Sequence, residues 1–178
     1  MQFIIRGGKK LEGAIRLAGA KNAATKMMVA SLLTSEPCVL ENFPRIGDTK
    51  ITAELCASVG ARTSEKGSTL TIQTPEITNA RVVSLSRRNR IPILALGPLL
   101  ARIGEAEVPI LGGDNIGPRP VDIHLAALHA LGAEIEMRPN SYVARARRGL
   151  HGADITLRYP SVVATENAML AAVLAQGR

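Results

Sequence analysis

Aromatic side chains are nearly absent from this chain of 178 residues. They make up 2% of the sequence, with no tryptophan, two tyrosines and two phenylalanines. Hydrophobic residues nevertheless reach 46%, so the core of a globular fold must be built from Leu, Ile, Val, Ala and Met. The scarcity of aromatic rings also argues against a platform on which the bases of a single-stranded nucleic acid would stack.

Cysteines are equally scarce, and no apolar run is long. Cys38 and Cys56 lie in apolar surroundings without metal-ligand spacing, which favours two buried thiols over a metal site. No run reaches the length of a membrane span, and the start of the chain lacks the apolar stretch of a secretion signal. We therefore expect a cytoplasmic protein that uses no metal or cofactor and does not contact a membrane.

The charge of the chain is biased toward the positive sign. The formal net charge is +7, which suits anionic partners, either nucleic acid or phosphorylated small molecules. The basic residues are scattered, with local clusters at 87–90 and 145–148. The second cluster is typical of a solvated strand face, and we expect no nucleic-acid partner.

The order helix, strand, helix, hairpin is predicted twice along the chain. Helices that are apolar nearly all round, and hence expected to be buried, are predicted at 22–33, 91–103 and 164–174. After each of the first two come a strand, an amphipathic helix and a hairpin, at 39–43, 49–59 and 62–73, then at 108–111, 121–131 and 134–146. Short connecting strands are predicted at 14–17 and 153–157. Gly60 and Gly132 follow the amphipathic helices as C-caps and set a period of about 72 residues.

The third copy of this pattern begins with its apolar helix and then stops at Arg178. A repeat of this kind buries its inner helix against the neighbouring repeats. We therefore expect the chain to be part of a longer polypeptide or to pair with another chain.

Three polar segments stand where the apolar helices are expected to begin. Lys21 can hold a phosphate or carboxylate beside the free N–H groups of a helix start, and Asn22 can bond a sugar hydroxyl or acetamide. Arg90 precedes the second helix, at an end where the helix dipole disfavours a cation unless an anion is bound. Ser161 and Thr165, before the third helix, are typical caps. Ordinary capped or exposed helix starts are the alternative interpretation of the same residues.

The loop at 112–122 is rich in glycine and combines an acid with a cation. Its glycines allow close backbone approach to a ligand, Asp114 is the candidate acid, and Arg119 can grip a phosphate with two hydrogen bonds. Asp122 is a second candidate acid, or else the N-cap of the helix that follows. His124 is close enough in sequence to face the same ligand, whereas His129 and His151 are expected on the surface. A simple tight turn is the alternative interpretation of this loop.

Four motifs occur in one order: Gly-Ala-Lys-Asn at 19–22, Arg90 before Ala-Leu-Gly-Pro-Leu, Gly-Gly-x-x-Ile-Gly-x-Arg-Pro-Val-Asp-x-His at 112–124, and Ser-Val-x-Ala-Thr-Glu-Asn at 161–167. Together they resemble the UDP-N-acetylglucosamine 1-carboxyvinyltransferase family of enolpyruvyl transferases. The resemblance covers the whole chain but only the N-terminal portion of that family. It implies an α/β fold, an inside-out α/β barrel of repeated units with helices at the core. It also implies an opening segment at 1–20 that packs with a second domain, and a first domain at 21–178 that is truncated in its third repeat.

The resemblance further implies a reaction and the residues that carry it. The enolpyruvyl group of phosphoenolpyruvate would pass to the 3-hydroxyl of UDP-N-acetylglucosamine with release of phosphate, at the start of peptidoglycan synthesis and hence of cell-wall growth and division. Lys21, Arg90 and Arg119 would hold phosphoenolpyruvate or the nucleotide phosphates, and Asn22 would contact the sugar. The nucleotide would be lined by Arg119, Pro120, Val121, Asp122, Ile123, His124, Ser161 and Val162. The general base is expected in the missing C-terminal portion, so we expect little turnover from this chain alone.

One residue departs from the family pattern. Most members carry Cys at the position of the loop general acid, and this chain carries Asp114. An Asp can donate the proton if its pKa is raised toward neutrality, but it cannot be alkylated as a thiolate is. We therefore expect insensitivity to fosfomycin, which acts on that Cys. The alternatives are a shikimate 3-phosphate enolpyruvyl transferase, a non-catalytic half that binds UDP-sugar, and a basic nucleic-acid module.

Overall fold

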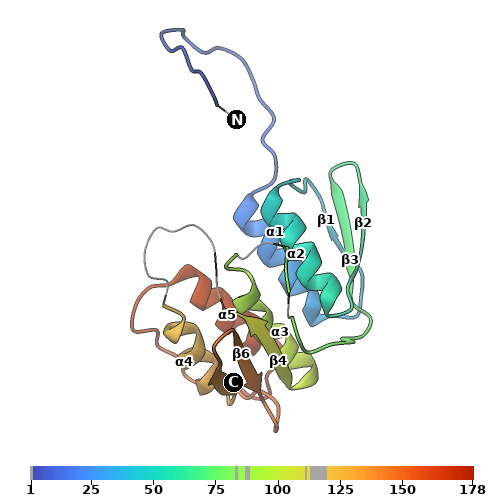
Figure 1. Ribbon diagram of the computed structural model, residues 1–178, viewed down its shortest axis with the longest axis vertical. Helices are drawn as coiled ribbons and strands as arrows, with labels where there is room; N and C mark the ends of the chain where they lie inside the picture. The colour runs from blue at the N-terminus through green and yellow to red at the C-terminus, as the bar shows by residue number, and fades with distance from the viewer. Residues whose placement is uncertain (1, 83, 87–88, 111, 113–119) are drawn as a thin grey trace.

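The computed structural model describes residues 2–82, 84–86, 89–110, 112 and 120–178. Its elements follow one another in the same order twice, and a last helix ends the series (Figure 1). The first unit (residues 21–73) contains α1 (Lys21–Ala30) with the 3-10 turn η1 (Ser31–Leu33), β1 (Cys38–Leu40), α2 (Gly47–Ser58), β2 (Arg62–Lys66) and β3 (Thr69–Gln73). The second unit (residues 92–145) contains α3 (Pro92–Ile103), β4 (Glu105–Pro109), α4 (Asp122–Ala130), β5 (Glu134–Met137) and β6 (Ser141–Arg145), and α5 (Val162–Ala172) follows it.

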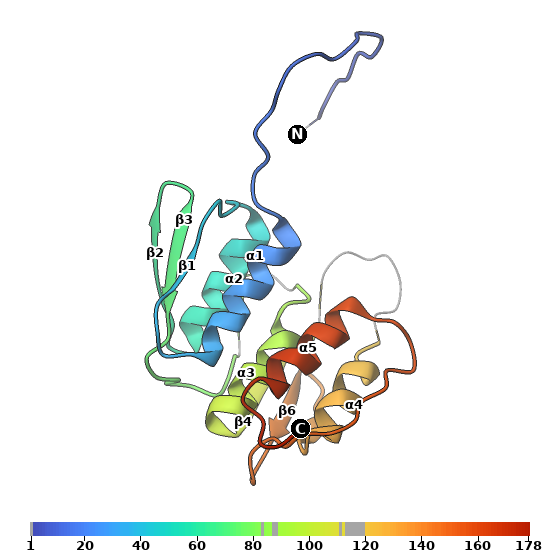
Figure 2. The same ribbon diagram turned by 180° about the vertical axis from the view of Figure 1, so that it is seen from behind.

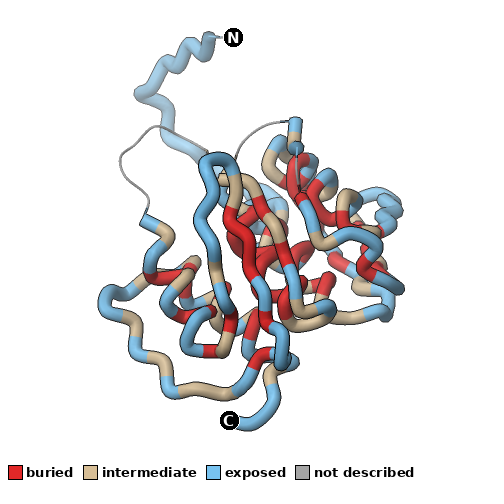
Figure 3. Tube along the Cα trace, turned by 60° about the horizontal axis from the view of Figure 1, so that its bottom comes forward, coloured by how far each residue is buried: buried red, intermediate tan, exposed pale blue. Residues whose placement is uncertain are grey.

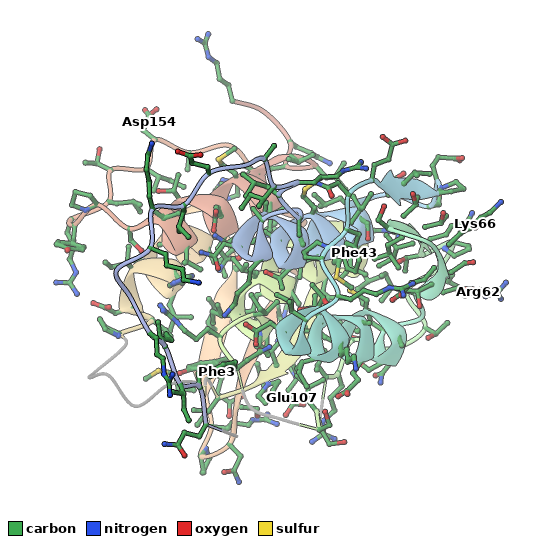
Figure 4. The ribbon with its side chains drawn as sticks, turned by 90° about the horizontal axis from the view of Figure 1, so that it is seen from above. Phe3, Phe43, Arg62, Lys66, Glu107 and Asp154 are labelled. Atoms are coloured by element: carbon green, nitrogen blue, oxygen red, sulfur yellow. The ribbon has the colours of Figure 1, made fainter. Side chains whose placement is uncertain are left out.

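Each unit forms a three-stranded antiparallel sheet with the last strand in the middle. The orders are β1-β3-β2 and β4-β6-β5. The predicted hairpins are confirmed, the first to the residue, because β2 pairs with β3 from Arg62 opposite Gln73 to Lys66 opposite Thr69. The predicted strands at 39–43 and 108–111 are shifted, since pairing with β3 and β6 sets the observed bounds. Figure 4 shows Arg62 and Lys66 of β2 pointing into solvent, so this sheet edge is protected by charge.

Helix α3 forms the centre of the core, and residues 92–100 along it are all buried. It packs against α1 and η1 of the first unit, against α5, and against β4. Figure 3 shows the buried residues gathered in the interior of the molecule, with exposed residues around them. The guanidinium of Arg102 links the two units, because it donates to the carbonyls of Leu32, Thr34 and Thr74 at 2.8 to 3.2 Å.

The expectation that all three apolar helices are buried holds only for α3. Met27 of α1 is 50% exposed, and Val162 and Met169 of α5 are 70% and 64% exposed. The reason is positional, since α3 has neighbours on all sides whereas α1 and α5 are covered on part of their circumference. None of the described helices is long and apolar enough to span a membrane.

The predicted connecting strands at 14–17 and 153–157 are wrong. Residues 2–18 are exposed and without regular structure, and they extend away from the rest of the chain in both views (Figures 1 and 2). Residues 153–157 are likewise irregular. Apolar alternation at these places predicts strands only if a partner strand lies alongside, and none of the described strands does.

Candidate functional site

The helices that carry the predicted site residues begin at one end of the molecule. Figures 1 and 2 show α1, α3, α4 and α5 starting at the end from which the N-terminal segment leaves. The first turn of a helix presents N–H groups without intrahelical partners and a partial positive charge. These starts carry Lys21 and Asn22, Arg90, Asp122 and Ser161, so the structure brings together the described members of the predicted site at this end.

At the start of α1, Lys21 and Asn22 are exposed. The Lys21 ammonium lies 2.6 Å from a carboxylate oxygen of Asp48, in the first turn of α2. Gly19 just before them lies against the backbone of Asn42, where a Cβ atom would collide with the carbonyl oxygen. A glycine is therefore required at position 19 for the chain to lead into α1. The sequence analysis did not predict that Asp48 would pair with Lys21.

The segment before α3 is fixed on both sides of Arg90, which is exposed. The side-chain oxygen of Asn89 accepts the N–H of Ile91 at 3.1 Å. The Asn89 carbonyl accepts the N–H of Gly112 at 3.1 Å, which places the first glycine of the glycine-rich loop beside Arg90. Upstream, Glu54 of α2 accepts both the backbone N–H and the hydroxyl of Ser86, and these bonds hold the pKa of Glu54 below its usual range.

Asp114 and Arg119 lie outside the described residues. Beyond them Pro120 is exposed and Val121 is half-buried. The prediction that Asp122 caps α4 is wrong, because the helix begins at Asp122 and Val121 occupies the cap position. The Asp122 carboxylate instead forms an ion pair with the guanidinium of Arg158. A carboxylate in the first turn still interacts favourably with the helix dipole.

Ile123 and His124 are buried, with exposed fractions of 7% and 5%. Nδ1 of His124 lies 3.3 Å from the side-chain nitrogen of Asn167 in α5. Which group donates depends on the tautomer of the ring, and where the amide nitrogen donates, Nδ1 is the unprotonated acceptor. Burial lowers the pKa of His124, the positive charge of Arg90 lowers it further, and Asp122 acts in the opposite direction.

At the start of α5, Ser161 is the N-cap, as predicted, and its hydroxyl oxygen accepts the N–H of Ala164 at 3.3 Å. Thr165 is not a cap, since it lies within the helix and its hydroxyl donates to the Ser161 carbonyl at 2.9 Å. Val162 is exposed. His129 and His151 are exposed, and Cys56 is buried with its pKa raised to about 12 by desolvation. Within the described part of the chain no group of three or more His, Cys, Asp or Glu residues could hold a metal.

Prediction missed the contacts between helices at this end. Lys26 and Glu166 form an ion pair at 2.7 Å that joins α1 to α5, and Arg158 reaches Asp122. The two residues of each pair lie far apart in sequence, so no local spacing could have indicated either ion pair. The Glu-Asn of the motif at 161–167 was the one available signal, because it places two polar residues in a helix of apolar composition.

Comparisons with known proteins place these observations in a family. A sequence profile described as EPSP synthase (3-phosphoshikimate 1-carboxyvinyltransferase) matches residues 5–178. The chain is 51% identical, over 97% of its length, to the UDP-N-acetylglucosamine 1-carboxyvinyltransferase of Chlamydia abortus, and 49% identical over 99% to that of a Caulobacter species. It covers 40% and 42% of those two relatives. The chain thus spans about two fifths of the length of the curated relatives it matches.

Solved structures share the fold. The enolpyruvyl transferase NikO from Streptomyces tendae has a TM-score of 0.77 at 22% identity, covering 96% of this chain and 40% of that one. EPSP synthase from Acinetobacter baumannii has a TM-score of 0.67 at 17% identity, covering 93% of this chain and 39% of that one. These likenesses agree with the α/β fold described above. With the profile match over nearly all residues and curated relatives near 50% identity, the chain belongs to the EPSP synthase family.

Proposed function

We propose that this chain is the N-terminal portion of an enolpyruvyl transferase that acts on UDP-N-acetylglucosamine in the cytoplasm. The observation that carries the proposal is the 51% identity, over 97% of the chain, to a relative named for that activity. In the reaction the 3-hydroxyl oxygen of the sugar forms a bond to the carbon of phosphoenolpyruvate that bears the phosphate. The carbon–oxygen bond to phosphate breaks, phosphate leaves, and the hydroxyl proton is lost.

The binding of anionic groups is assigned to the cations at the common helix end. Lys21 and Arg90 are both exposed there, beside the first turns of α1 and α3. We assign Lys21, Arg90 and Arg119 to phosphoenolpyruvate and the nucleotide phosphates, because cations and free helix N–H groups stabilise the charge of phosphate together. An incoming phosphate would compete with Asp48 for Lys21.

The nucleotide is assigned to the starts of α4 and α5. Its proposed lining runs from Arg119 to His124 and includes Ser161 and Val162, with Asn22 on the sugar. Because Ile123 and His124 are buried, they support the wall from behind, whereas Pro120 and Val162 are exposed and can contact the ligand directly. The ion pair between Asp122 and Arg158 holds the first turn of α4 against the segment that leads into α5.

The wider architecture follows from the same proposal. Residues 1–20 would be an opening segment that packs with a second domain, and residues 21–178 a first domain of an inside-out barrel that continues beyond this chain. Exposed Phe3 and Ile5 in the first segment, seen for Phe3 in Figure 4, support this because such apolar side chains would be buried by a second domain.

Binding and turnover test the proposal separately. Calorimetric titration of the chain should detect UDP-N-acetylglucosamine and no shikimate 3-phosphate. Phosphate release from phosphoenolpyruvate should be absent for the chain alone, because half a cleft neither excludes water nor supplies the base. It should appear when the chain is joined to the C-terminal portion of the Chlamydia abortus relative. Full turnover by the chain alone would contradict this division of roles.

Three other functions would be revealed by the same measurements of binding and turnover. The description of the family profile favours shikimate 3-phosphate as the alternative acceptor, and binding of that compound alone would replace our proposal. Binding of UDP-N-acetylglucosamine without turnover in the joined enzyme would indicate a non-catalytic half. Steeply salt-dependent binding of duplex DNA without sugar-nucleotide binding would indicate a nucleic-acid module.

Asp114 is assigned as the general acid of the loop, by its position in the sequence. In the joined enzyme, Asp114→Asn should lower kcat by about 100- to 10,000-fold, the usual contribution of a general acid. Fosfomycin should cause no time-dependent loss of activity, because a carboxylate is not alkylated as a thiolate is. Asp114→Cys should make the enzyme sensitive while retaining activity. Rapid inactivation of the enzyme with Asp114 in place would refute the assignment.

A further inference from the structure

Two adjacent residues of α5, Glu166 and Asn167, contact the other helices that begin at the candidate site. Glu166 accepts a hydrogen bond from the ammonium of Lys26 at 2.7 Å, across to α1. The two side chains are 29% and 21% exposed, so water and salt screen the pair less than a pair on the open surface. The residues are 140 positions apart in sequence, and the pair therefore fixes α5 relative to α1.

Asn167 makes the corresponding contact with α4. Its side-chain nitrogen lies 3.3 Å from Nδ1 of His124, and both residues are buried, Asn167 completely. Successive residues of a helix point about 100° apart, as 3.6 residues per turn require. One residue can therefore reach α1 while the next reaches α4.

The backbone of the same turn lies against α3. At Gly97 a Cβ atom would stand 3.2 Å from the Asn167 carbonyl oxygen and 2.9 Å from the Ala171 nitrogen. Only a residue without a side chain allows this approach of α5 to α3. One turn of α5 thus contacts α1, α3 and α4, and it begins five residues after the N-cap Ser161, about 7.5 Å along the helix from its start.

These polar contacts are poorly explained by stability alone. Oε2 of Glu166 and Oδ1 of Asn167 are buried, and no described residue donates to either oxygen. An unsatisfied buried oxygen lowers the free energy of unfolding, and apolar contacts of similar volume are often as stable as a buried ion pair. Directional bonds differ from apolar contacts in fixing the rotation and axial position of the helices they join.

We propose that Glu166 and Asn167 are positioning residues that hold the starts of α1, α4 and α5 at the spacing that a sugar nucleotide requires. This inference rests on the proposed function, because the ligand it invokes is UDP-N-acetylglucosamine. Lys26 is the sixth residue of α1 and Glu166 the fifth of α5, so the ion pair lies within the first two turns of both helices. The two residues act through the helices and do not contact the ligand.

Reversal of the ion pair tests this role. Lys26→Glu and Glu166→Lys should each raise the Kd of the chain for UDP-N-acetylglucosamine about tenfold, a typical coupling for groups in contact. The double variant, with the charges exchanged, should restore the Kd to within about threefold of the original. Lys26→Arg should leave the Kd unchanged, since it keeps the charge. Calorimetry gives the Kd, and circular dichroism establishes that each variant is folded.

Glu107→Gln is the matched control. It removes the ion pair of Glu107 with Arg81, in which the carboxylate is 16% exposed, on β4. Its Kd should equal that of the original chain. If a charge-reversed single variant does not fold, Lys26→Gln and Glu166→Gln replace it with the same expected direction.

Three results would overturn the inference. Single variants that are folded and bind with unchanged Kd would show that the pair has no positioning role. Failure of the charge exchange to restore binding would show that the loss did not arise from the pair. A chain that binds no UDP-N-acetylglucosamine in its original form would overturn the proposed function, and this inference with it.

Discussion

The two units contain the same elements in the same order, yet their central helices differ in environment. Residues 92–100 of α3 are all buried, whereas the ten residues of α1 include four that are buried. Both helices are followed by a strand, a helix and a hairpin. Since α3 alone lies between α1 and α5, the difference arises from its middle position in the series and not from its own unit. Burial in a repeated fold is therefore set by neighbouring units as much as by local sequence.

The outward faces of the two sheets also differ. In the first, Ser64 and Thr71 lie in register with Val39, whose side chain is 59% exposed. In the second, Arg145 stands opposite Glu105 and Glu134. A cleft of about 430 Å³ on this charged face is lined by Arg81, Arg138, Arg145, Glu105 and Glu107 among others. Arg81 pairs with Glu107 and Arg138 with Glu136, so this face is a set of neutralised ion pairs more than a binding site for anions.

The glycines after α2 and α4 offer the strongest test of how alike the units are. Gly60 and Gly132 both have positive φ, at 109° and 94°. At Gly60 a Cβ atom would stand 2.7 Å from the backbone oxygen of Glu76, which cannot move alone. At Gly132 the nearest atom, also at 2.7 Å, is Nε2 of the His151 side chain, which can rotate away. Gly60→Ala should lower the free energy of unfolding by about 3 kcal/mol, and Gly132→Ala by about 1.5 kcal/mol.

Gly67→Ala separates the cost of the positive φ from the cost of the steric contacts at Gly60 and Gly132. Gly67 has a φ of 59°, and no atom lies within 4 Å of the position its Cβ would take. Its substitution should cost about 1 kcal/mol, from backbone conformation alone. Urea unfolding followed by circular dichroism measures all three variants. Equal losses at positions 60 and 132 would show that the contacts around the two glycines are equivalent after all.

What could be predicted from sequence is the part that short-range patterns decide. The hairpin of β2 and β3 was predicted to the residue, because Gly67 and Ser68 mark the turn and the alternation of polar and apolar residues at 69–73 marks the second strand. The helix bounds were predicted to within a few residues by helical patterns that end at glycine or, for α1, at Thr34-Ser35-Glu36-Pro37. The cap at Ser161 was likewise predicted, since a hydroxyl beside a helix start has one common use.

What could not be predicted depends on contacts between elements distant in sequence. The exposure of α1 and α5 depends on which neighbours are present, and strands at 14–17 and 153–157 need partners that the described residues do not supply. Asp122 is not the cap of α4, because the helix begins at this residue, and its carboxylate pairs with Arg158, far along the chain. The pairing of Lys26 with Glu166 has the same origin. Of the candidate site, prediction gave the helix starts but not the bonds that position them.

Lowering the pH should destabilise the second unit more than the first, by less than the glycine substitutions do. All three histidines follow residue 120, and none lies in the first unit. Burial and Arg90 hold the pKa of His124 below its usual value of 6.5. As the pH falls below 6.5, the unfolded chain binds a proton that the folded chain does not, and the free energy of unfolding decreases. The decrease should continue until the pH falls to the lowered pKa.

His124→Gln should remove this part of the pH dependence between pH 7 and pH 5, while His129→Gln on the exposed side of the same helix should leave it unchanged. Urea unfolding at several pH values measures both slopes. Amide hydrogen exchange shows where the chain is destabilised. His124 and Asn167 join α4 to α5, so acid should reduce the protection of these two helices before that of α1 and α2. An equal loss of protection in both units, or a slope that His124→Gln does not change, would show that the buried imidazole does not make the second unit more sensitive to acid than the first.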